Sequence, residues 1–122
     1  MSTLLVVEDE YRLRKLVART LEGQGHTVIE ASNGVDAIAL AGTFKNTIDM
    51  VITDIIMPMM RGPDMVQALR RQRPDLKVIY MSGTSHKDIA GEAARDAQYL
   101  DKPCSLQVLT KTVGDMLSAA QG

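Results

Sequence analysis

Residues 3–10 have the sequence Thr-Leu-Leu-Val-Val-Glu-Asp-Glu, in which an apolar run ends at three consecutive acids. Every residue from Leu4 to Val7 is apolar, without the alternation of a half-exposed strand. The run therefore predicts a strand over Thr3–Val7 that is buried on both faces, as in a parallel sheet. The acids that follow would lie at the carboxyl end of this strand, where ligand sites form in open parallel sheets.

The same order of a short apolar run and then a helical stripe recurs along the chain. Further strands are expected at Thr27–Glu30, Met50–Thr53, Val78–Met81 and Gln98–Leu100. Helices are expected over Arg12–Glu22, after the cap residue Asn33, from Pro63, over Ser85–Arg95 and after the cap residue Ser105. Strict alternation predicts one α/β domain over residues 1–122. Its fold would be a flavodoxin-like, doubly wound, five-stranded parallel sheet of order 2-1-3-4-5.

The fourth helix of this series should be short or irregular. Gly91 lies in the middle of Ser85–Arg95, and the apolar residues of that segment are mostly alanines, which bury little surface. By contrast, the last helix has a long apolar stripe and should be well formed.

Composition limits the classes of function. The 122 residues include 14 Lys and Arg and 15 Asp and Glu, and the resulting net charge of -1 argues against a nucleic-acid partner. One cysteine is too few for a disulfide framework or a cysteine-based zinc cluster. No run reaches the roughly 18 apolar residues of a membrane span, and no signal peptide is apparent. We therefore expect a cytoplasmic protein without membrane insertion.

Polar residues that can carry chemistry follow four of the expected strands. Glu8 and Asp9 follow the first, Asp54 the third, Ser82 the fourth and Lys102 the fifth. Carboxylates that converge repel one another, and a hard cation such as Mg²⁺ relieves this. An ammonium and a hydroxyl suit phosphoryl oxygens, and a carboxylate can itself be the nucleophile. The pattern predicts a phosphoryl-transfer site.

Four segments at these strand ends resemble the signatures of the response-regulator receiver domain of two-component signalling. They are Val6–Glu10, Thr53–Pro58, Met81–Gly83 and Asp101–Pro103. The resemblance covers the whole chain. The pattern Met-Ser-Gly, followed later by Lys-Pro-x-Ser-Leu, is most similar to receivers that are attached to hybrid histidine kinases.

The resemblance implies that Asp54 accepts a phosphoryl group from a histidine kinase or a histidine phosphotransfer domain. It also implies that Mg²⁺, or Mn²⁺, is held by Glu8, Asp9, Asp54 and the backbone carbonyl of Ile56. Such a domain phosphorylates and dephosphorylates itself but turns over no external substrate. A monomer or weak dimer is implied.

Ser82 and Lys102 would bind the phosphoryl oxygens, and Ser82 with Tyr99 would form the switch of the family. The chain departs from the family at Cys104, where phenylalanine is usual, and the interval from Ser82 to Lys102 is about two residues short. Many members also have aspartate in place of Glu8.

Two other functions compete with this interpretation. A Mg²⁺-dependent phosphohydrolase with an aspartyl nucleophile would need a general acid two residues after Asp54, where this chain has Ile56. A flavodoxin-like flavin carrier would need a Ser/Thr/Gly-rich phosphate loop after the first strand, where this chain has acids.

Some residues are expected to have no site role, or a role in partner contacts. The basic run Arg70, Arg71 and Arg73 is expected to form a solvated face, and both histidines, His26 and His86, are expected on the solvated surface. Met57 is expected to pack inward, whereas Met59 and Met60 are candidates for exposed partner contacts.

Overall fold

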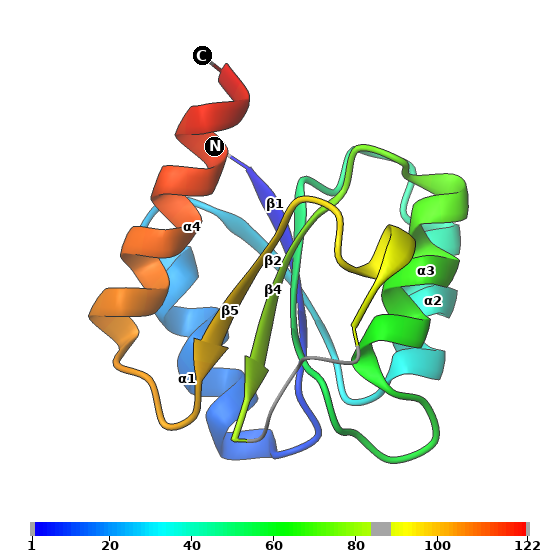
Figure 1. The fold of residues 1–122 in the computed structure, drawn as a ribbon. Coiled ribbons are helices and arrows are strands. Elements are labelled where there is room, and N and C mark those ends of the chain that lie inside the picture. Colours follow the sequence, from blue (N-terminus) through cyan, green and yellow to red (C-terminus); the bar gives the residue numbers. More distant parts are fainter. Residues whose placement is uncertain (1, 84–88, 122) are drawn as a thin grey trace.

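The computed structural model describes residues 2–83 and 89–121 and shows a parallel sheet with helices on both faces (Figure 1). The strands are β1 (Thr3–Val7), β2 (Thr27–Ala31), β3 (Met50–Asp54), β4 (Lys77–Ser82) and β5 (Ala97–Asp101). They pair in the order β2-β1-β3-β4-β5. The predicted fold class and strand order are confirmed, and β1 has the predicted bounds.

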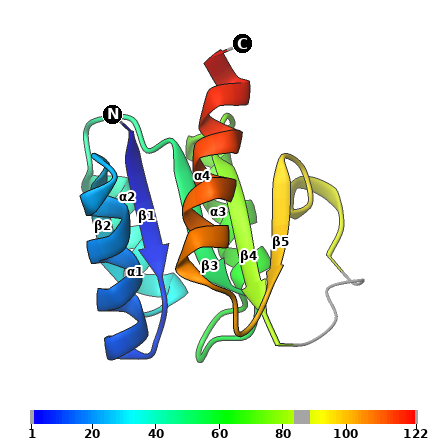
Figure 2. The same cartoon turned by 90° about the vertical axis from the view of Figure 1, so that its left-hand side faces the viewer.

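The helices are α1 (Tyr11–Gly23), α2 (Gly34–Thr43), α3 (Gly62–Gln72) and α4 (Leu106–Gln121). Figures 1 and 2 show α1 and α4 on one face of the sheet and α2 and α3 on the other. Two capping predictions are confirmed, because Asn33 accepts a hydrogen bond from the Asp36 amide and Ser105 accepts one from the Val108 amide. None of the helices in the described part of the chain is long and apolar enough to cross a bilayer.

The sheet has an apolar core on each face. In β1, Leu5 and Val7 pack into the core beneath α2 and α3, and Leu4 and Val6 pack into the core beneath α1 and α4. This explains the unbroken apolar run, because successive side chains of a strand point to opposite faces and both faces are covered here.

The chain between β4 and β5 contains one 3₁₀ turn, η1 (Gly91–Ala93), within its described residues 83 and 89–96. The predicted irregularity is thus confirmed for these residues, whereas 84–88, with His86, lie outside the described residues. Gly91 has a φ of +64°, a conformation that glycine adopts without strain. Tyr80 Oη donates a hydrogen bond of 2.7 Å to the Ala93 carbonyl and ties this turn to β4.

The prediction of a solvated basic face is wrong for two of its three arginines. Arg70 is only 4% exposed, and its guanidinium donates to the carbonyls of Leu76 and Glu92. Arg73 donates to three carbonyls, that of Ala41 in the last turn of α2 and those of Phe44 and Asn46 in the α2–β3 connection. Both guanidinium groups donate to backbone carbonyls in loops and near the ends of helical segments, and these bonds account for the inward orientation of the two arginine side chains. Arg71 is exposed, as predicted.

His26 is also half-buried rather than solvated, and burial lowers the pKa of its imidazole. It lies in the turn between α1 and β2, where its amide bonds the Leu21 carbonyl. The backbone contact holds the residue against the end of the helix, which explains its partial burial.

Candidate functional site

The predicted site residues meet at one edge of the sheet. The parallel register pairs Val7 with Thr53, Asp54 with Met81, and Ser82 with Asp101, so these strands end at the same level. Residues that end a strand or directly follow one are therefore neighbours in space, although they lie far apart in the sequence.

Three carboxylates form the centre of this edge. Glu8, Asp9 and Asp54 each place one oxygen within 4.8 Å of the others. Asp54 is only 4% exposed and Glu8 is buried, whereas Asp9 is exposed. The cluster thus consists of two buried acids, Glu8 and Asp54, and one acid that is exposed to solvent, Asp9.

Lys102 is the cation of the site. Its Nζ lies 2.5 Å from Asp54 Oδ1 and 3.0 Å from Glu8 Oε1. The backbone amide of Lys102 donates to the Ser82 carbonyl, which fixes the start of the loop after β5 against the end of β4. One ammonium is therefore shared between two buried carboxylates.

These contacts shift the pKa values of the acids in opposite directions. Burial, together with the hydrogen bond to Glu8, raises the pKa of Asp54 to about 7 despite the nearby ammonium. Burial would also raise the pKa of Glu8, but hydrogen bonds with Asp54, the Glu10 amide and Lys102 together lower it. The hydrogen bond with Glu8 raises the pKa of Asp9. Without a further cation, Asp54 therefore tends to keep a proton near neutral pH.

The donor set fits a hard divalent cation. Carboxylate and carbonyl oxygens are the ligands that Mg²⁺ prefers, with positions left for water and phosphoryl oxygens. Asp54 Oδ1 is buried, and among the described residues no hydrogen bond of good geometry reaches it, despite the short ionic contact with Lys102. Glu8, Asp9 and Asp54 could hold such an ion together with the backbone carbonyl of Ile56.

Local contacts hold two of the acids in place. Glu8 Oε2 accepts a hydrogen bond of 3.1 Å from the Glu10 amide, just before α1 begins. The backbone of Asp54 lies so close to Gly62 that a Cβ at this glycine would overlap the Asp54 carbonyl oxygen. The Gly62 amide also donates a hydrogen bond of 2.8 Å to the Ile55 carbonyl.

The two predicted switch residues lie on neighbouring strands, Ser82 at the end of β4 and Tyr99 two residues before the end of β5. Ser82 is buried at the end of β4, and Tyr99 is half-buried. The Tyr99 ring stacks on Tyr80, with 5.5 Å between ring centroids and 22° between ring planes. Sequence reasoning had not singled out Tyr80, which resembles any aromatic of a buried strand.

Comparison with known proteins decides the family. The sequence model of the response regulator receiver domain matches residues 4–114. The chain belongs to the receiver domain family of two-component signalling.

Two curated relatives of this receiver come from Brucella abortus (strain 2308). The sensor kinase CckA is 39% identical over 118 residues, which are 95% of this chain but 12% of the kinase. The response regulator receiver protein CpdR is 31% identical over 122 residues, with 98% of this chain and 100% of CpdR covered. This receiver therefore spans about an eighth of the kinase and all of CpdR.

Solved structures of receivers support the fold. The crystal structure of the receiver domain from the hybrid histidine kinase CckA has a TM-score of 0.83 at 31% identity, covering 95% of this chain and 99% of that one. The response regulator receiver protein from Sinorhizobium medicae WSM419 has a TM-score of 0.86 at 28% identity, covering 97% and 95%. The predicted resemblance to hybrid-kinase receivers is confirmed.

The loop after Asp54 in this receiver contains methionines in three environments. Met57 is buried, as predicted, and Met59 is 73% exposed, as a partner contact would require. Met60 is half-buried and packs against Gly34 at the start of α2, so its predicted exposure is wrong. The α2 N-terminus passes close enough to cover it.

Two remaining predicted residues flank the receiver site. The side chain of Ile56 is exposed. Cys104 is half-buried, and burial raises the pKa of its thiol. Cys104 stands at the position where phenylalanine is usual in the family, and its side chain is smaller.

Proposed function

We propose that Asp54 is the phosphoacceptor of this receiver and takes its phosphoryl group from a phosphohistidine donor. The observation that carries this proposal is the contact of one buried carboxylate, Asp54, with both an ammonium and two further carboxylates. An isolated structural ion pair would need only one acid. A nucleophile that receives a phosphoryl dianion needs both a cation and a metal-binding acid set.

In the proposed step, an Asp54 oxygen attacks phosphorus and the phosphorus–nitrogen bond breaks. The electron pair of that bond leaves with the imidazole, which takes up a proton, and an acyl phosphate forms. Lys102 pairs with Asp54 before transfer and can follow the charge to a phosphoryl oxygen afterwards. Ser82 can donate its hydroxyl proton to another oxygen.

A divalent cation, Mg²⁺ or Mn²⁺, would neutralise charge on the phosphoryl oxygens when bound. Glu8, Asp9, Asp54 and the Ile56 carbonyl would hold it. The raised pKa of Asp54 gives this set a second role, because cations that stabilise the ionised carboxylate keep the nucleophile reactive.

The partner is proposed to be a histidine kinase or a histidine phosphotransfer domain. The likeness to the receiver of a hybrid histidine kinase supports this class of donor. Phosphorylation would draw Ser82 toward the new phosphoryl group and alter the packing of Tyr99, which lies against Tyr80.

We propose a signalling role rather than turnover of an external substrate. The phosphohydrolase alternative needs a general acid two residues after the nucleophile, and Ile56 has no proton to donate. The Ile56 side chain is also exposed to solvent.

The proposal is tested with acetyl phosphate as a small phosphodonor and intact-protein mass spectrometry. The wild type should gain one phosphoryl group only with Mg²⁺ present, and Asp54→Asn should gain none. Asp75→Asn is the matched control, because Asp75 is an exposed acid just before β4 at the opposite end of the sheet. Labelling of the Asp54→Asn variant, or labelling that does not need a divalent cation, would contradict the proposal.

A further inference from the structure

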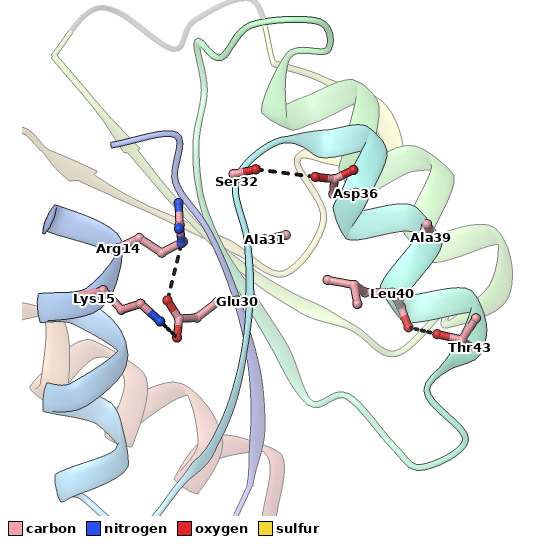
Figure 3. Close-up of a pocket in the computed structure, with 9 residues that line it drawn as sticks. All are labelled: Arg14, Lys15, Glu30, Ala31, Ser32, Asp36, Ala39, Leu40 and Thr43. Atoms are coloured by element: carbon pink, nitrogen blue, oxygen red, sulfur yellow. Dashed lines mark hydrogen bonds and ion pairs between the residues drawn. The ribbon is translucent and has the colours of Figure 1, made fainter. Parts of the chain in front are cut away.

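Arg14 connects the acidic turn after β1 to the edge strand β2. Its Nη1 donates a hydrogen bond of 2.9 Å to the Glu8 carbonyl, and its Nε donates one of 3.3 Å to Glu30 Oε1. The side chain is only 14% exposed although it lies near the surface hollow between α1, β2 and α2 (Figure 3). A cation on α1 thus reaches the backbone of a candidate metal ligand.

The Glu8 carbonyl lies where the chain leaves the sheet. The Glu8 amide still bonds the Ala31 carbonyl of β2, but α1 begins only three residues later, at Tyr11. Within this turn the Glu8 carboxylate is already engaged by Lys102 and by the Glu10 amide. The bond from Arg14 therefore fixes the orientation of the peptide that joins Glu8 to Asp9.

We propose that Arg14 is a positioning residue for the divalent-cation site. Its guanidinium holds the Glu8–Asp9 peptide from one side, and Glu30 holds the guanidinium from the other, so that the carboxylates of Glu8 and Asp9 converge on Asp54. The inference rests on the proposed function, because it concerns the same cation. Arg14 itself does not bind the ion.

Lys15 is a natural comparison for Arg14 within the chain. Its Nζ also pairs with Glu30, at 3.0 Å, and both cations lie over the Tyr11 ring, at 5.3 Å for Arg14 and 5.6 Å for Lys15. Lys15 is more exposed, at 36% of its side chain. Among the described residues it has no hydrogen bond to the Glu8 carbonyl, so it shares the charge and partners of Arg14 but not the contact with the turn.

Charge and positioning predict opposite effects for the loss of Arg14. Removal of a nearby positive charge strengthens the attraction of acids for a cation, and this applies to both residues. Loss of a group that orients metal ligands weakens metal binding about 10-fold or more. If the Arg14 variant binds the cation less tightly than the matched Lys15 variant, the difference shows that Arg14 positions the metal ligands.

The experiment is a titration with Mn²⁺, followed by the electron paramagnetic resonance signal of the free ion, for the wild type, Arg14→Gln and Lys15→Gln. Arg14→Gln should bind Mn²⁺ about 10-fold more weakly than the wild type. Lys15→Gln should bind it equally well or slightly more tightly. Competition by Mg²⁺ should give the same order.

Equal affinity of the two glutamine variants would overturn the inference while Mn²⁺ binding by the wild type stays intact. Absence of Mn²⁺ binding by the wild type would instead contradict the proposed function. If Arg14→Gln does not fold, Arg14→Lys is the second variant. It keeps the positive charge, but its single nitrogen cannot reproduce the two separate bonds of the guanidinium to the Glu8 carbonyl and to Glu30. Its affinity should fall severalfold, and wild-type affinity in this variant would overturn the inference.

Discussion

Lys102 Nζ lies 2.5 Å from Asp54 Oδ1, and this ion pair joins the loop after β5 to the last residue of β3. The same ammonium serves Glu8 at 3.0 Å, so one cation faces two buried carboxylates. With Asp9 also nearby, the carboxylates outnumber the ammonium groups in this cluster. Burial, together with the neighbouring Glu8, raises the pKa of Asp54 to about 7.

Asp54→Asn should remove a pH dependence from the stability of the metal-free protein. Burial and Glu8 raise the pKa of Asp54 from 3.8 to about 7, so between these values the folded state keeps a proton that the unfolded state has lost. The resulting stabilisation is fully present below the unfolded-state pKa of 3.8, and it is lost as the pH rises through the folded-state pKa of about 7. In chelator, the melting temperature of Asp54→Asn should exceed that of the wild type by about 3–5 °C at pH 8 and by less at pH 5.

Thermal unfolding followed by circular dichroism in chelator measures this difference. Asp75→Asn, which changes an exposed acid outside the site, should melt like the wild type at both pH values. Mg²⁺ should raise the melting temperature of the wild type by linkage and that of Asp54→Asn much less. A lower melting temperature for Asp54→Asn at pH 8 in chelator would show that the site is not electrostatically strained.

Arg70→Ala should destabilise the fold strongly although Arg70 lies in a basic run on α3. The guanidinium donates to the carbonyls of Leu76 and Glu92, and its removal leaves the buried Leu76 carbonyl and the partly buried Glu92 carbonyl without this donor. The free energy of unfolding should fall by about 2–4 kcal/mol in denaturant titrations, because each lost donor costs about 1–3 kcal/mol. Arg71→Ala is the control, since Arg71 is exposed and should change stability by at most about 0.5 kcal/mol. Equal stability of both variants would show that the hydrogen bonds of Arg70 do not stabilise the fold.

The contacts of the arginines could not be predicted from the sequence, unlike the fold and the position of the candidate site. The bounds of β1 could be predicted because five local residues determine them, and the site could be predicted because strand ends converge in any parallel sheet. The roles of Arg14 and Arg70 depend on carbonyls that the tertiary fold brings within reach. No periodicity or spacing in the sequence encodes those contacts. Burial of Met60 was missed for the same reason, because it depends on the approach of Gly34.

Tyr80→Phe should loosen the turn η1 while it preserves the ring stack with Tyr99. The variant loses the hydrogen bond from Tyr80 Oη to the Ala93 carbonyl and keeps the aromatic ring. Loss of one such bond costs about 1 kcal/mol, so amides of residues 91–95 should exchange with deuterium about five times faster. Even in the wild type they should exchange faster than those of 106–117 in α4.

Hydrogen exchange measured by NMR provides this comparison residue by residue. Tyr11→Phe is the control, because Tyr11 is an exposed tyrosine on α1 and its hydroxyl has no contact with η1 among the described residues. Unchanged exchange at 91–95 in Tyr80→Phe would show that the hydroxyl does not hold the turn.

Gly62→Ala should impair the site without any change in its charges. A Cβ at Gly62 would overlap the Asp54 carbonyl oxygen and lie 3.3 Å from Ile55 Cα, so the backbone that carries Asp54, the proposed nucleophile, must shift. Overpacking of this kind lowers the free energy of unfolding by about 1–3 kcal/mol, and the rate of labelling by acetyl phosphate should fall at least tenfold. Gly114→Ala is the matched control, because a Cβ at Gly114 in α4 meets open space and should stabilise the helix by about 1 kcal/mol. Denaturant titration and the labelling rate separate the two effects. If Gly62→Ala loses stability but is labelled at the wild-type rate, the close approach supports the fold and not the placement of Asp54.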